Sequence, residues 1–119
     1  MGVRHRIHAG IPVIDVEGEF YGDSETDKLR DMIRAEADRG SMKLVLNLYG
    51  CRMMNSAALG VMIEAKRTYD AMGGEIRLCG LGHRAMKSLL VTVRLMSWFE
   101  ISDTETEAIA VLTRARASA

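Results

Sequence analysis

One short apolar segment constrains the fold of this chain more than any other feature. Residues Lys43 to Leu48 read KLVLNL and lie between Gly40 and Gly50. A short apolar run bounded by glycines is typical of a strand that is buried on both faces of a sheet. Such a strand needs other elements packed against both faces, so the segment favours an α/β domain.

Two strands and a helix are predicted before this segment. Residues Val3 to His8 and Ile11 to Glu17 alternate apolar with polar side chains on either side of Ala9-Gly10. This pattern predicts two strands joined by a tight turn. Asp23-Ser24 can cap a following helix, whose apolar residues recur at helical spacing until Gly40 ends it.

Strands and helices continue to alternate after the central segment. The pattern predicts a helix over Ser56 to Met72, a strand over Glu75 to Cys79, a helix over Arg84 to Val93 and a strand over Trp98 to Ile101. A last helix starts near Thr104, with Ile109 and Leu112 turned inward. Crossovers of this length make the connected strands parallel. We therefore expect a mixed sheet of about five strands with four helices packed on it.

Size and composition limit the classes of protein to consider. The 119 residues predict a single domain over 1–119, with a core at about 3–113 and a frayed tail at 114–119. Sixteen basic against sixteen acidic residues leave no broad positive field for nucleic acid. The longest apolar run, 57–63, is far shorter than the roughly 20 residues that span a bilayer. With two cysteines and no apparent signal peptide, we expect a cytoplasmic protein.

Ser56 stands where the central strand region meets the next helix. Its side chain follows Asn55 and precedes an apolar helical stripe. Serine is a favoured N-cap residue because its hydroxyl accepts a backbone N–H of the first turn. The residues alone therefore favour a structural interpretation, in which Ser56 caps the helix.

Four segments in combination suggest a functional interpretation as well. They are Val16 to Phe20 (VEGEF), Leu44 to Leu48 (LVLNL), Met54 to Val61 (MNSAALGV) and Gly73 to Leu78 (GGEIRL). From Val13 to Ile101 the sequence resembles the STAS family of bacterial anti-sigma factor antagonists. The segment containing Ser56 is similar to the phosphorylation motif of that family.

The resemblance implies a regulatory binding protein rather than an enzyme, without a cofactor or a metal. It implies that the unphosphorylated protein binds an anti-sigma factor that is also a serine kinase, and that phosphorylation of Ser56 ends this binding. A serine phosphatase would reverse the modification. The expected partner-binding residues are Glu19, Phe20, Tyr21, Asp23, Met53, Met54, Asn55, Ser56, Ala57 and Ala58.

Three alternatives remain open at this stage. The chain could be a STAS scaffold that does not switch, in which Ser56 is only a helix cap. It could be the STAS subunit of a membrane lipid transporter. It could also bind a nucleotide, because Gly80 to Ala85 (GLGHRA) fits the G-x-G-x-x-A pattern and Asp103 follows about 20 residues later. However, the 39 residues after Gly80 are too few for a full dinucleotide-binding fold.

The remaining histidines, cysteines and methionines favour structural roles. His5 and His8 are three apart on a predicted strand and face opposite sides, so they cannot hold one metal together. We expect them at the surface. Cys51 and Cys79 are expected as small buried side chains. Most methionines fall on predicted core stripes, and Met53 and Met54 are the exceptions expected at a partner surface.

Overall fold

The computed structural model describes the backbone of residues 2–118 and the side chains of residues 2–95 and 97–114. The elements are β1 (Gly2–His8), β2 (Ile11–Phe20), α1 (Ser24–Asp38), β3 (Lys43–Asn47), β4 (Cys51–Met54), α2 (Ser56–Met72), β5 (Glu75–Cys79), α3 (Arg84–Thr92), η1 (Leu95–Ser97), β6 (Glu100–Ser102) and α4 (Glu105–Ser118). The predicted fraying of 114–119 concerns mainly residues whose side chains lie outside the described part of the chain.

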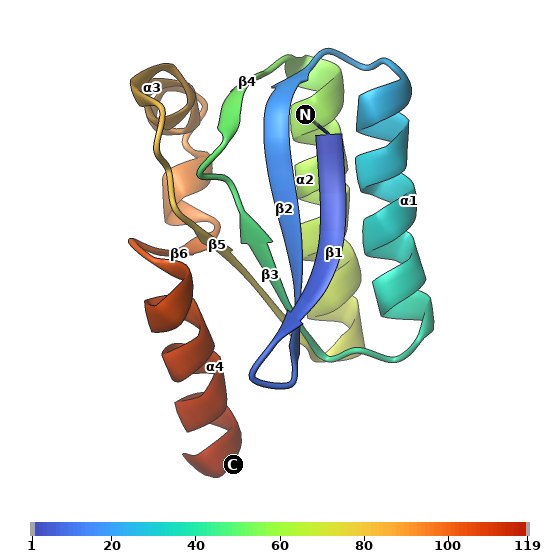
Figure 1. Ribbon diagram of the computed structural model, residues 1–119, viewed down its shortest axis with the longest axis vertical. Helices are drawn as coiled ribbons and strands as arrows, with labels where there is room; N and C mark the ends of the chain where they lie inside the picture. Colours follow the sequence, from blue (N-terminus) through green and yellow to red (C-terminus); the bar gives the residue numbers. More distant parts are fainter. Residues whose placement is uncertain (1, 119) are drawn as a thin grey trace.

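The strands form one mixed sheet in the order β1-β2-β3-β5-β6, and β4 pairs with the far end of β2. Strands β1 and β2 are antiparallel, whereas all other pairings are parallel. Figure 1 shows α1 and α2 on one side of the sheet and α3 and α4 on the other. The predicted α/β fold with a mixed sheet and four helices is confirmed.

The first two strands are joined by the tight turn that the sequence predicts. Ala9 and Gly10 both adopt positive φ angles, of 53° and 80°. Two successive positive φ values are the signature of a type I′ hairpin turn, whose twist matches that of the paired strands. Strand β2 continues to Phe20, three residues beyond the predicted end, because its last part pairs with β4.

The core has two parts, one on each side of the central strand. In β3, Leu44, Val45 and Leu46 are fully buried, as the KLVLNL pattern predicts. Leu44 and Leu46 belong to the larger cluster beneath α1 and α2, while Val45 packs with α4. Cys51 and Cys79 are buried, and burial raises the pKa of each thiol to about 12. The cysteines therefore behave as small apolar side chains.

Three local expectations were wrong. Strand β4, which has only four residues, was not expected between β3 and α2. Val93 was predicted as the last residue of a helix, but it is 41% exposed and follows α3, which ends at Thr92 before Arg94 adopts a positive φ of 61°. The 3-10 helix η1 occupies the next residues, so the last strand begins at Glu100, two residues later than predicted.

None of the helices within the described residues has the combination of length and apolar composition needed to cross a membrane.

Candidate functional site

Ser56 is the first residue of α2, at the sheet edge where the parallel strands end (Figure 1). It follows directly from β4, which pairs in parallel with the last residues of β2. In this register Phe20 is opposite Met54. The pairing therefore places the end of β2 beside the start of α2, and the two connecting loops form one continuous surface.

Asn55 holds these two loops together and caps α2. Its side-chain Oδ1 accepts a hydrogen bond from the backbone N–H of Ala58 at 3.1 Å, and its Nδ2 donates to the backbone oxygen of Tyr21 at 2.8 Å. Its own backbone N–H donates to the oxygen of Phe20 at 2.9 Å. Asn55 thus satisfies one otherwise unpaired donor of the helix start and joins α2 to β2.

The cap is therefore Asn55, and the structural interpretation of Ser56 as the cap was wrong. Asn55 keeps an extended backbone with φ −88° and ψ −175°, as an N-cap requires, whereas Ser56 is already helical. The sequence did contain the signal, because asparagine is at least as good an N-cap as serine and stands one residue earlier.

The Ser56 side chain is exposed to solvent. Among the residues that the structure describes, no side-chain or backbone group forms a hydrogen bond with its hydroxyl. The first turn of α2 contains no acidic residue. Since the start of a helix favours negative charge, a phosphate on Ser56 is compatible with the fold.

We expect Asn55→Ala to lower the free energy of unfolding by about 1–2 kcal/mol, because it removes the cap and the link to Tyr21. Ser56→Ala is the matched control and should change this free energy by less than about 0.5 kcal/mol. Urea denaturation, monitored by circular dichroism, measures the free energy of unfolding of both variants. A larger loss for Ser56→Ala than for Asn55→Ala would contradict the assignment of the cap.

Of the ten expected partner-binding residues, three are buried and seven are exposed or partly exposed. Phe20, Met54 and Ala58 are buried in the core and present no side chain to a partner, which corrects their place in the expected surface. By contrast, Glu19 is exposed and Met53 is partly exposed. We call the remaining seven residues the Ser56 surface: Glu19, Tyr21, Asp23, Met53, Asn55, Ser56 and Ala57.

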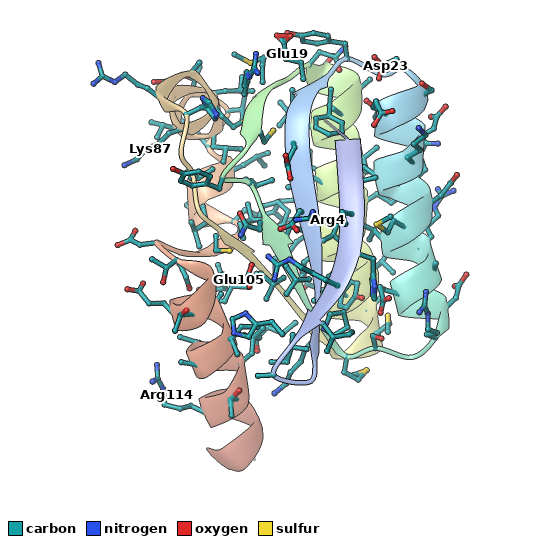
Figure 2. The ribbon with its side chains drawn as sticks, in the orientation of Figure 1. Arg4, Glu19, Asp23, Lys87, Glu105 and Arg114 are labelled. Carbon is teal, nitrogen blue, oxygen red and sulfur yellow. The ribbon has the colours of Figure 1, made fainter. Side chains whose placement is uncertain are left out.

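The Ser56 surface combines acidic and apolar groups. Tyr21 is 49% exposed, and its hydroxyl donates to Glu19 Oε2 at 2.9 Å, which raises the pKa of Tyr21. Asp23 is exposed and caps α1 by accepting from the backbone N–H of Thr26. Figure 2 shows Glu19 and Asp23 at the same end of the molecule. A phosphate on Ser56 would add negative charge to a surface that already has two carboxylates.

Gly22 lets the loop after β2 approach α2 closely. This role was not predicted from the sequence. Its φ is +85°, and a Cβ at this position would lie 3.0 Å from the Cβ of Ala57. A side chain at residue 22 would therefore be strained and would crowd Ala57. The available signal was a glycine between Tyr21 and Asp23 in the short loop before α1.

The glycine pattern after β5 has a packing explanation. A Cβ at Gly82 would lie 2.7 Å from the backbone oxygen of Tyr49 and 3.0 Å from its ring. A Cβ at Gly80, whose φ is +71°, would lie 3.0 Å from Asn47 Oδ1. Both glycines therefore allow the segment after β3 to pack against this loop, and this close approach accounts for them without a nucleotide.

The two N-terminal histidines lie on opposite faces of β1, as predicted. However, they are partly buried rather than at the surface, because each contacts a glutamate. His5 Nε2 lies 2.5 Å from Glu36 Oε1 in α1, and His8 Nδ1 lies 2.5 Å from Glu105 Oε2 in α4. Within the described part of the chain, no group of three or more histidine, cysteine, aspartate or glutamate side chains could hold a metal ion.

Comparison with protein families agrees with this fold. The model of the STAS domain matches residues 3–108, which is most of the chain. The protein therefore belongs to the STAS domain family. A comparison with curated protein sequences finds no match.

Several solved structures share the fold. TM1081 from Thermotoga maritima, a candidate anti-sigma factor antagonist, has a TM-score of 0.83 and 19% identity over 93% of this chain and 94% of that one. The Bacillus cell fate determinant SpoIIAA in its phosphorylated form has a TM-score of 0.70 and 21% identity, covering 92% and 97%. A sulfate transporter family protein from Wolinella succinogenes has a TM-score of 0.72 and 12% identity, covering 91% and 88%. Identities this low show a common fold.

Proposed function

We propose that this protein is an anti-sigma factor antagonist that acts by partner switching. In its unphosphorylated form it binds, through the Ser56 surface, an anti-sigma factor that is also a serine kinase. Phosphorylation of Ser56 releases that partner, and a serine phosphatase restores binding. One observation carries this proposal: Ser56 presents an exposed hydroxyl, at the first residue of α2, that the helix does not use as its cap.

Electrostatics explains how the modification would switch binding. A phosphoserine adds a charge of about −1.5 to −2, which the start of α2 tolerates in water. In the complex the same charge would have to leave water beside Glu19, Asp23 and the partly exposed side chain of Met53. Removing an unpaired charge from water costs several kcal/mol, so the complex would be lost while the fold persists.

Two features of relatives and of the chain support the proposal. SpoIIAA has this fold both in its phosphorylated and in its unphosphorylated form, the latter with a TM-score of 0.73 and 19% identity over 97% of this chain and 98% of that one. In this chain Ala58 points into the core, so its methyl group leaves the approach to Ser56 open.

Phosphopeptide mass spectrometry tests the modification. Trypsin cleaves after Arg52 and Lys66, and the peptide between them contains Ser56 as its only hydroxyl side chain. We expect a phosphorylated form of this peptide in the protein isolated from its native cells. If no phosphate is found across growth and stress conditions, the switch is contradicted and a STAS scaffold that does not switch is favoured.

The shared fold with a sulfate transporter family protein favours a second candidate, a STAS subunit that docks on a transporter. In that case the Ser56 surface would contact the ATPase of a membrane lipid transporter. Copurification of this protein with such an ATPase, independent of the state of Ser56, would select this candidate over the first.

A further inference from the structure

A cavity lies at the opposite end of the sheet from Ser56. It has a volume of about 610 Å³, between the β1–β2 hairpin and the loop that joins α1 to β3. Figure 1 shows this hairpin at the bottom of the view and the start of α2 at the top. Small-molecule sites in proteins commonly have volumes of about 300–1,000 Å³, so the cavity is large enough for an organic ligand.

The walls of this cavity are mainly apolar and unusually exposed. Ile7 in β1 is 59% exposed and Met42 in the loop is 45% exposed, and both line the cavity. Ile11 and Pro12 from the start of β2 complete the apolar wall. An apolar ligand seated here would remove Ile7 and Met42 from water, which is favourable in proportion to the area covered.

A buried carboxylate lies at the inner wall, where polar protein groups contact both of its oxygens. The Glu36 side chain is only 2% exposed. Its Oε1 lies 2.5 Å from His5 Nε2 and 3.4 Å from Arg39 Nη1, and its Oε2 accepts a hydrogen bond from the Ser41 hydroxyl at 2.8 Å. Glu36 therefore orders the wall rather than attracting a cation from solution.

The charge that remains at the cavity is positive. The Arg39 side chain is 62% exposed, so part of its guanidinium faces solvent at the cavity although it also pairs with Glu36. Lys43 also lines the cavity, and its ammonium donates to the backbone oxygen of Leu112 rather than to a carboxylate. The lining thus has two cations and one carboxylate, a net positive charge that would attract an anionic group on a ligand.

From these observations we infer that the cavity binds a small amphipathic ligand that has an apolar body and one anionic group. The body packs against Ile7 and Met42, and the carboxylate, sulfonate or phosphate pairs with Arg39. The site is separate from the Ser56 surface and does not depend on its phosphorylation.

Two fluorescent probes with the same aromatic body test this inference. 1-Anilinonaphthalene-8-sulfonate has a sulfonate, and N-phenyl-1-naphthylamine lacks it. Both are titrated into the full chain, and we expect saturable binding of the sulfonate probe with one site per chain. Arg39→Gln should weaken the sulfonate probe at least fivefold and change the uncharged probe by less than twofold. Met42→Ser should weaken both probes at least threefold.

Matched controls separate this site from nonspecific binding. Arg67→Gln removes an exposed cation from α2, and Val93→Ser removes an exposed apolar side chain after α3. Neither should change the affinity of either probe, and Ser56→Asp should not change it either. Circular dichroism confirms that each variant is folded. The inference is overturned if binding does not saturate, or if Arg39→Gln affects both probes equally or neither.

Discussion

Replacing Ser56 with aspartate is expected to weaken binding of the anti-sigma partner at least 100-fold while the fold remains intact. The exposed position at the first residue of α2 accepts a negative charge, and interaction with the helix start should raise the free energy of unfolding by up to about 0.5 kcal/mol. In the proposed complex the same charge would be buried near Glu19 and Asp23. The predicted loss corresponds to about 3 kcal/mol of binding free energy.

Two control variants sharpen this prediction. Ser56→Ala should bind the partner as tightly as the unphosphorylated protein and should no longer be released by the kinase. Thr106→Asp places the same charge at an exposed position in the first turn of α4, away from the Ser56 surface, and should leave affinity within twofold. Isothermal titration calorimetry with the purified partner measures all three. Tight binding by Ser56→Asp would contradict the switch.

The second large effect is expected at Glu105, where α4 is tied to the sheet. Glu105 accepts hydrogen bonds from the Arg6 guanidinium and, at 3.0 Å, from Asn47 Nδ2, and it also contacts His8. Its side chain is 15% exposed. Because Glu105→Gln leaves the charge of Arg6 only partly compensated, it should lower the free energy of unfolding by about 2–4 kcal/mol.

The lowered pKa of Glu105 should make the free energy of unfolding depend on pH. The hydrogen bond from Arg6 is the main cause that lowers the pKa of Glu105 from 4.5 to about 2, and Arg6 also lowers the pKa of Asp15. A carboxylate with a lowered pKa stabilises the fold above its unfolded pKa, and this contribution is lost as it becomes protonated in the folded state. Stability should therefore fall as the pH decreases from about 4.5 to about 2.

Urea unfolding between pH 2 and pH 7 measures this dependence. Glu105→Gln should make the fall between pH 4.5 and pH 2 less steep, because one of the two shifted carboxylates is removed. Glu107→Gln is the control, because Glu107 is exposed and lies two residues after Glu105 in α4. This variant should keep the pH dependence of the unmodified protein. Equal slopes for all three proteins would contradict the role of Glu105.

The sequence predicted those parts of the fold that depend on local pattern. The buried run of β3, the glycine that follows α1 and the turn at Ala9-Gly10 are each encoded by a few neighbouring residues. Strand β4 was missed because it has four residues, and its pairing with β2 includes a register shift between Gly18 and Glu19. A short strand that depends on a distant partner has no periodic pattern of its own.

The surroundings of Ser56 were predicted only in part. The pattern of strands and helices placed Ser56 correctly at the junction between a strand and a helix, yet the burial of Phe20 and Met54 depends on which face of β2 and β4 meets the core. The contact between His8 and Glu105 joins residues 97 positions apart, so it required the fold. The cavity beside Arg39 likewise exists only once the hairpin lies next to the α1–β3 loop.

The most direct test of the central claim compares Ser56 in the bound and free pools of the protein. The protein is isolated from its native cells and separated into a pool that is complexed with the anti-sigma partner and a pool that is not. The phosphorylated fraction of the tryptic peptide 53–66 is then measured in each pool. We expect phosphate on Ser56 to be confined to the free pool. An equal phosphorylated fraction in both pools would contradict it.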